Sequence, residues 1–234
     1  MNRPETTLFM LMSVDGKIST GDTVDLDFDR DLPKVSGARE CLHQYYDLEK
    51  QTDLFSLNTG RVMAKIGINE RAQKPKKALF SFVIIDNQPH ITLKGVEYLS
   101  QWLTKLILVT TNADHHAILT PRENVVPVVY KNEVDFVDLF GRLKVDHGIE
   151  RLTIQSGGTL NAVLLRQNLI DHISIVVAPV LVGGKTTPTL VDGEALHTLE
   201  DLVNLKALKL TMCCVIMDSY IHLRYDIINP ASSG

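Results

Sequence analysis

Apolar runs of strand length alternate with segments of helix length along most of this chain, and this alternation limits its fold more than any other feature. The runs are rich in β-branched and aromatic residues, as in Leu79–Ile85. The segments between them carry apolar residues at helical spacing. Strands separated by helices imply a mainly parallel sheet with right-handed crossovers. The sequence therefore predicts the α/β class, with a mainly parallel central sheet and flanking helices.

The pattern also places the individual elements. The expected strands are Thr6–Met12, Asp53–Leu57, Leu79–Ile85, Lys105–Thr110, Val125–Tyr130, Arg151–Gln155 and Asp171–Val177. The expected helices are Ser36–Leu48, with Ser36 as N-cap, Gly95–Leu103, Ala113–Leu119, Val134–Lys144 and Leu160–Leu165. The acidic segment Gly21–Lys34 lacks apolar periodicity and predicts an excursion or lid loop.

The C-terminal part departs from the alternation. Leu205–Met217 and Ser219–Ile227 predict two long strands that form an antiparallel hairpin at the sheet edge. Residues 229–234 are mostly polar or small and predict a disordered tail. Residues 1–228 are expected to form a single domain.

Composition narrows the class of protein. With 44% hydrophobic residues and a net charge of −4, the 234-residue chain is predicted to be globular and to bind no nucleic acid. The three cysteines, Cys41, Cys213 and Cys214, favour buried structural thiols over a redox or metal role. The N-terminus lacks the pattern of a signal peptide, and no apolar run reaches membrane-spanning length. These features predict no membrane association and a cytoplasmic location.

The segment Gln155–Asn161 contains the turn Gly157-Gly158 between an expected strand and an expected helix. Helix N-termini offer unpaired backbone N–H groups and partial positive charge, and glycines let a ligand approach the backbone closely. This turn therefore predicts a phosphate site, with a plain tight turn as the alternative. It matches neither the dinucleotide G-x-G-x-x-G pattern nor a P-loop.

Other segments at expected strand ends carry polar residues. Asp15 could orient a polar ring or donate a proton, or could simply form the turn before Gly16. The guanidinium of Arg61 could bind a phosphate or lie exposed at a helix start. The Gly183-Gly184 pair predicts either a flexible loop that lines a cleft or a surface turn. The histidines show no metal-ligand spacing, so no metal site is expected. The adjacent His115 and His116 lie on an expected short surface helix and are therefore expected to be solvated.

Three motifs together resemble the reductase domain of riboflavin biosynthesis, from about Thr6 to Tyr225. They are Ser13-Val14-Asp15-Gly16-Lys17-Ile18, Ser156-Gly157-Gly158-Thr159-Leu160-Asn161 followed by Leu169-Ile170-Asp171-His172, and Pro179-Val180-Leu181-Val182-Gly183-Gly184. The resemblance implies a dihydrofolate-reductase-like fold, NADPH as cofactor and a homodimer. It also implies a small-molecule substrate, 5-amino-6-(5-phosphoribosylamino)uracil, whose ribose is reduced by hydride transfer.

The resemblance assigns residues to this site. The implied cofactor residues are Asn58, Thr59, Gly60, Arg61, Val62, Ile85, Asp86, Gly157, Gly158, Thr159 and Leu160. The implied substrate residues are Ser13, Asp15, Ser156 and Gly184, with Asp15 as the catalytic candidate.

The chain also departs from the family pattern. Ser156 stands where the riboflavin reductases usually carry a substrate-binding Glu, and Lys65–Asn69 replaces their D-D-P-x-L-[TN]-x-R segment. No H-x-E…P-C-x-x-C signature is present, so no fused zinc deaminase is expected. Two alternatives stay open: a reductase of the same fold with another carbonyl, imine or pteridine substrate, and a non-catalytic nucleotide-binding protein.

Overall fold

The computed structural model describes residues 2–228, and the chain folds as two compact units. The first unit contains the residues up to Glu5 together with Asp53–Ser156. The second unit contains Thr6–Thr52 and the described residues from Gly157 onward. The disordered tail predicted for residues 229–234 lies outside the described residues.

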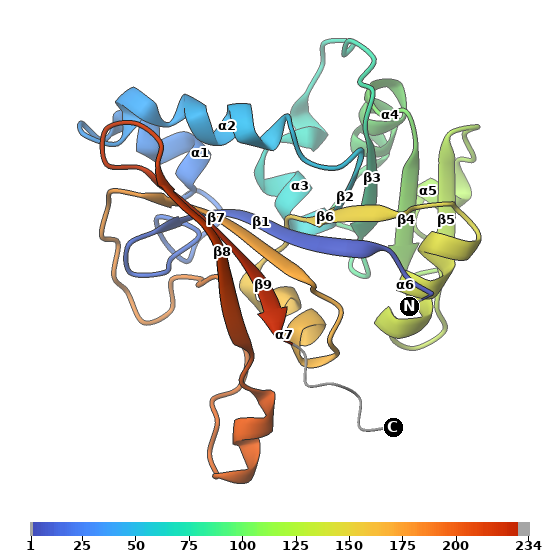
Figure 1. Ribbon diagram of the computed structural model, residues 1–234. Coiled ribbons are helices and arrows are strands. Elements are labelled where there is room, and N and C mark those ends of the chain that lie inside the picture. Colours follow the sequence, from blue (N-terminus) through green and yellow to red (C-terminus); the bar gives the residue numbers. More distant parts are fainter. Residues whose placement is uncertain (1, 229–234) are drawn as a thin grey trace. The chain divides into compact units, whose positions relative to one another are not determined.

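The described part of the first unit holds a parallel sheet with the strand order β5-β4-β3-β2-β6 (Figure 1). Its strands are β2 (Phe55–Thr59), β3 (Ser81–Ile85), β4 (Leu106–Thr110), β5 (Val125–Val129) and β6 (Arg151–Ile154). The interior strand β4, which lies between β5 and β3, is buried along its whole length, because helices cover both faces of such sheets. The predicted parallel sheet is confirmed here, with β2 shifted two residues toward the C-terminus.

The helices of the first unit follow these strands. They are α3 (Gly60–Lys65), η3 (Ile68–Glu70), α4 (Leu93–Trp102), α5 (His116–Leu119) and α6 (Phe136–Val145). Helix α4 begins where the Thr92 hydroxyl caps the Gly95 N–H at 3.3 Å. Its residues Val96 and Leu99 are fully buried and pack with Ile84 of β3, so the helical spacing predicted from the sequence defines the core side.

The second unit contains the strand order β1-β7-β9-β8, formed by β1 (Glu5–Ser13), β7 (His172–Ala178), β8 (Ala207–Val215) and β9 (Ile221–Ile228). Strand β1 is parallel to β7, whereas β9 is antiparallel to both β7 and β8. The predicted C-terminal hairpin is therefore confirmed.

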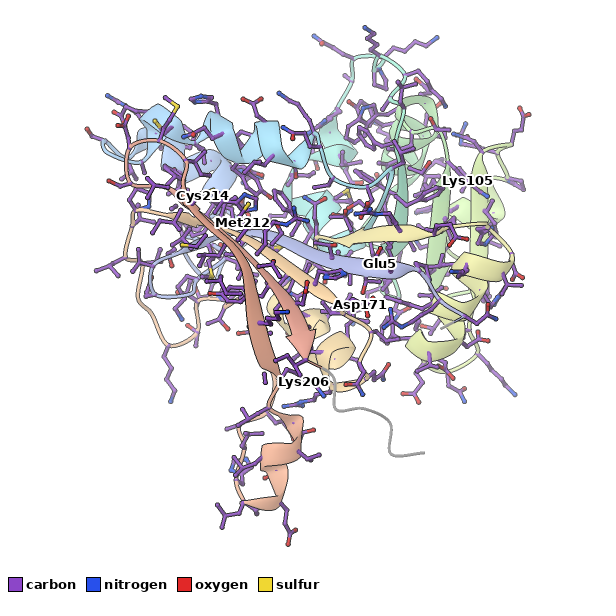
Figure 2. The ribbon with its side chains drawn as sticks, viewed as in Figure 1. Glu5, Lys105, Asp171, Lys206, Met212 and Cys214 are labelled. Atoms are coloured by element: carbon purple, nitrogen blue, oxygen red, sulfur yellow. The ribbon has the colours of Figure 1, made fainter. Side chains whose placement is uncertain are left out.

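The prediction of buried cysteines is wrong for two of the three. Cys41 is buried, but Cys213 and Cys214 are exposed on β8, where Figure 2 labels Cys214 and Met212. Successive strand residues point to opposite faces, and eight of the nine β8 residues are exposed. Both faces of this strand are therefore uncovered within the described chain.

The remaining elements of the second unit are α1 (Phe28–Asp31), η1 (Leu32–Lys34), η2 (Arg39–Cys41), α2 (His43–Glu49), α7 (Gly158–Arg166) and η4 (Glu200–Asn204). The helix expected from Ser36 begins at His43 instead, after the turn η2 that buries Cys41. The loop expected over Gly21–Lys34 ends in α1 and η1, because Phe28 and Leu32 are anchored in the core with Phe9 and Tyr220. Helix α7 confirms the helix expected after Gly157.

Candidate functional site

The carboxyl ends of β2, β3 and β6 lie at one edge of the parallel sheet in the first unit. Thr59 ends β2, Ile85 ends β3, and Gln155 follows β6. Ligands of parallel α/β sheets bind at this edge. The predicted residues Asn58–Val62, Ile85, Asp86 and Ser156 are therefore gathered there within their unit.

A polar network joins two of these strand ends. The buried Asn58 side chain donates to the Ser56 hydroxyl at 3.0 Å, and that hydroxyl donates to Gln155 Oε1 at 2.8 Å. The Thr59 hydroxyl caps α3 by accepting the Val62 N–H at 3.4 Å. Asn58 thus lies in the strand, and Thr59 ends the strand and caps the helix. Arg61 is exposed at the start of the helix.

Asp86 follows β3 and is 1% exposed. Its Oδ1 accepts the backbone N–H of His90 at 3.1 Å and the His90 Nδ1 at 2.9 Å. Its Oδ2 accepts the Ile91 N–H at 3.0 Å and the His115 Nε2 at 3.1 Å. Burial would raise the pKa of Asp86, but these hydrogen bonds outweigh it and lower the pKa.

The expectation that His115 is solvated is wrong, because its side chain is fully buried. The histidine caps α5 through its Nδ1, which accepts the Ala117 N–H at 3.1 Å. Sequence reasoning missed both His90 and His115. The spacing of His90 four residues after Asp86 in a turn was the one available signal.

In the second unit, the carboxyl ends of the parallel strands β1 and β7 lie at one sheet edge. Asp15 follows β1 and accepts the Ser13 hydroxyl at 2.6 Å, the Val182 N–H at 3.1 Å and the Gly183 N–H at 2.6 Å. The Ser13 hydroxyl and the two backbone donors lower the pKa of Asp15 to about 2. The carboxylate is therefore ionised at neutral pH, which favours an orienting role over that of a proton donor.

The loop after β7 is tied down by Lys17 as well. The Lys17 Nζ donates to the Gly184 carbonyl at 2.7 Å and to the Thr187 carbonyl at 2.9 Å. Lys17 is 9% exposed, so its ammonium is held inside the turn. These bonds hold the loop in place, which argues against the flexible loop that was one of its two interpretations. Sequence reasoning did not assign Lys17 a role.

Helix α7 begins at Gly158, and Gly157 at its N-cap makes no side-chain capping bond. A Cβ added to Gly157 would meet no atom within 4 Å, so the backbone there is open to a ligand. At Gly158 a Cβ would lie 2.4 Å from the Asp192 carboxylate and 2.3 Å from the Thr189 carbonyl oxygen. Gly158 is therefore required by its own chain, whereas Gly157 leaves room for a phosphate.

The structure thus brings the predicted residues together as two sets. The first unit holds Asn58, Thr59, Gly60, Arg61, Val62, Ile85, Asp86 and Ser156. The second unit holds Ser13, Asp15, Gly157, Gly158, Thr159, Leu160 and Gly184. Within the second set, Asp192 N–H donates to the Gly158 carbonyl and Leu190 N–H to the Gly16 carbonyl, so one segment joins the α7 start to the Asp15 turn.

Comparison with known proteins gives consistent matches over most of the chain. A family model described as the RibD C-terminal domain matches residues 4–218. A 2,5-diamino-6-ribosylamino-4(3H)-pyrimidinone 5′-phosphate reductase of Methanothermobacter thermautotrophicus is 28% identical over 208 residues, which are 87% of this chain and 91% of that protein. A protein of the same name from Archaeoglobus fulgidus is 28% identical over 204 residues, covering 82% and 88%.

Among solved structures, RibD of Acinetobacter baumannii (form 2) aligns with a TM-score of 0.67 at 17% identity. The alignment covers 97% of this chain and 59% of that chain. At this identity the likeness is one of fold. It confirms the dihydrofolate-reductase-like α/β fold predicted from the sequence motifs.

Proposed function

Since the chain belongs to the RibD C-terminal domain family, we propose that it is a reductase of riboflavin biosynthesis that transfers a hydride to the ribose of a ribosylaminopyrimidine phosphate. The family match over residues 4–218, which includes residues of both units, carries this proposal. The substrate is 5-amino-6-(5-phosphoribosylamino)uracil or the 2,5-diamino compound in the names of the relatives. These compounds differ at C2 of the pyrimidine, which carries an oxo group in the uracil and an amino group in the 2,5-diamino compound.

The proposed cofactor is NADPH, which would supply the hydride from C4 of its nicotinamide. The α7 N-terminus fits a pyrophosphate, because Gly157 is open and carries no side-chain cap. We assign Gly157, Gly158, Thr159 and Leu160 to this cradle. We assign Asn58–Val62, Ile85 and Asp86 to the other cofactor segments, in which Arg61 is an exposed residue that could bind a phosphate.

The proposed substrate residues are Ser13, Asp15, Ser156 and Gly184. Asp15 is the exposed member at the end of β1, and its carboxylate can accept hydrogen bonds from a substrate. The buried Ser13 hydroxyl holds Asp15 and also accepts the Lys17 N–H at 2.9 Å, so Ser13 acts through the turn. The role of these residues is to orient the substrate carbon and to stabilise charge during the transfer.

We also propose that the protein is a homodimer, which is supported by the exposure of β8. Leu208, Leu210 and Val215 of this edge strand are 42%, 52% and 70% exposed. Long apolar edge strands are usually protected by pairing or by covering. Sedimentation of the intact chain and of a Leu210→Asp variant tests this, with a dimer expected for the first and a monomer for the second.

A cytoplasmic location is part of the proposal. The three cysteines are unpaired, as is usual in a reducing compartment. Among the described residues, no helix has the length and apolar character needed to cross a membrane.

Two assays test the proposed function. Calorimetric titration with NADPH should give micromolar affinity, and millimolar or absent affinity would contradict the assignment. Oxidation of NADPH followed at its absorbance maximum should occur with one of the two pyrimidine phosphates and not with dihydrofolate. Turnover with dihydrofolate alone would instead identify a different reductase of the same fold.

A further inference from the structure

The carboxylate of Asp86 has no acceptor position left for a ligand. An ionised carboxylate offers about four lone-pair sites. Asp86 accepts four hydrogen bonds from its own unit, two from His90 and one each from Ile91 and His115, at 2.9–3.1 Å. At 1% exposure the side chain is also closed to solvent. A ribose hydroxyl could reach this carboxylate only by displacing one of these donors.

The His115 ring fixes the direction of one of these bonds. Its Nδ1 accepts the Ala117 N–H, so the ring proton is on Nε2 and is donated to Asp86. The ring is fully buried and its two nitrogens are both used. Asp86 thus joins the end of β3 to the start of α5. The Thr110 hydroxyl strengthens this junction by donating to the Asp86 backbone carbonyl at 2.8 Å.

Gly60 shows that the same carboxylate also sets the position of α3. A Cβ built on Gly60 would lie 2.2 Å from both Cγ and Oδ1 of Asp86. Gly60 is the first residue of α3, so its backbone lies directly against the carboxylate. Positive φ does not explain this glycine, because Gly60 is not among the residues in the left-handed region. Close approach to Asp86 is therefore what requires Gly60.

We propose that Asp86 is a positioning residue of the cofactor site, which holds the α3 N-terminus at Gly60 and the His90 ring, and does not itself contact the cofactor. The inference rests on the proposed function, since it concerns how that cofactor is held. Three segments meet at this one carboxylate: the β2–α3 junction, the β3–α4 turn and the start of α5. His90 is the member that reaches the surface, with 37% of its side chain exposed and its Nδ1 on Asp86.

A carboxylate that contacts the cofactor and one that only positions other groups predict different effects on the preference between NADPH and NADH, which differ at the 2′ position of the ribose. A carboxylate that hydrogen-bonds a ribose 2′-hydroxyl favours NADH over NADPH, so its removal changes the preference between them. A positioning carboxylate has no such selectivity. For Asp86→Asn we therefore expect the Kd values of NADPH and NADH to rise by the same factor. We expect this factor to be about tenfold, which is within the range of coupling between groups in direct contact. Turnover at saturating NADPH should stay within about threefold.

The control is Asp53→Asn. Asp53 is a partly buried carboxylate in the same unit, just before the amino end of β2, whereas Asp86 follows the carboxyl end of β3. Asp53 accepts hydrogen bonds from Arg151 Nε and the Thr153 hydroxyl, both at 2.9 Å. This variant also loses hydrogen-bonded charge, but its cofactor Kd values should match those of the unaltered protein. An equal rise in both variants would show that Asp86 matters for folding alone, and a changed NADPH-to-NADH ratio in Asp86→Asn would show direct contact. Either result overturns the proposal.

Gly60→Ala provides a second, independent variant, which also serves if Asp86→Asn does not fold. Its methyl group would push against Asp86, so both Kd values should again rise together. In the double variant the combined loss should be smaller than the product of the single losses, because both act through one contact. Multiplicative losses would contradict the proposal. If the unaltered protein binds neither dinucleotide, the proposed function fails before this inference is reached.

Discussion

Asp86 in the first unit and Asp15 in the second are both carboxylates that directly follow a parallel strand, yet their surroundings differ. Asp86 is buried and accepts four hydrogen bonds from a turn and a helix start of its own unit. Asp15 is exposed and accepts three, two of them from a loop 167 and 168 residues away in sequence. The position after a strand is therefore insufficient to define a ligand residue. Burial decides whether the carboxylate serves the chain alone or can also face a substrate.

The largest expected difference between the two is in stability. Asp86→Ala should lower the free energy of unfolding by about 4 kcal/mol, because it leaves several buried donors without an acceptor. This corresponds to roughly a thousandfold in the folding equilibrium. Asp15→Ala should cost far less, since water can replace the carboxylate at an exposed turn. Urea unfolding followed by circular dichroism measures both losses. Equal unfolding midpoints for the two variants would show that burial does not distinguish the two carboxylates.

The next difference is in catalysis. Asp15→Asn keeps the side-chain shape but removes the charge that we propose orients the substrate, so kcat should fall about a hundredfold, the typical cost of misplaced reacting groups. The Kd for NADPH should stay within about threefold of that of the unaltered protein. The opposite pattern is expected for Asp86→Asn, which should change Kd and leave kcat nearly constant. Loss of cofactor binding in Asp15→Asn would remove the distinction between the two residues.

The glycines beside the two carboxylates extend the comparison. Gly60 lacks space for a side chain, since its Cβ would overlap Asp86, whereas Gly183 has open space but a φ of 74°. Gly60→Ala should therefore destabilise the fold by about 2 kcal/mol through overpacking. Gly183→Ala should cost about 1 kcal/mol through left-handed backbone strain. Thermal unfolding of both variants tests the order, and a larger effect at Gly183 would show that the loop is more constrained than Asp86.

Most of the fold was predictable because its strands carry a strong signal. β3 and β4 are short apolar runs buried on both faces, and α4 has its apolar residues at helical spacing. The start of β2 was misplaced because this strand buries the polar residues Ser56 and Asn58. Asn58 bonds Ser56, and Ser56 bonds Gln155, which lies about a hundred residues away in sequence. The helix expected at Ser36 failed for a related reason. The turn η2 is held by burial of Cys41 in the core, which no local pattern indicates.

The candidate site was predictable at its glycines and less so at its charged residues. Gly157 and its helix were found from the strand–turn–helix pattern alone. The role proposed for Asp86 was not, because one of the four donors to its carboxylate is His115, which is 29 residues away and was expected to be solvated. The exposure of Cys213 and Cys214 was also missed, since an apolar strand at an open edge has the same sequence as a buried one. A contact distant in sequence therefore accounts for the first error, and the open edge of the sheet accounts for the second.

The smallest expected effect is on thermal stability at low pH, and it depends on the charge of Asp15. Its pKa in the folded protein is about 2, below the ordinary value of 3.8. A lowered pKa means that the carboxylate stabilises the fold fully above about pH 4, and that this contribution is lost as the pH falls through about 2. The difference in Tm between the unaltered protein and Asp15→Asn should therefore be constant from pH 7 to pH 5 and shrink between pH 4 and pH 2. A difference that persists unchanged to pH 2 would show that the charge of Asp15 is not what fixes the Val182–Gly183 loop, and that the two carboxylates differ less than their hydrogen bonds indicate.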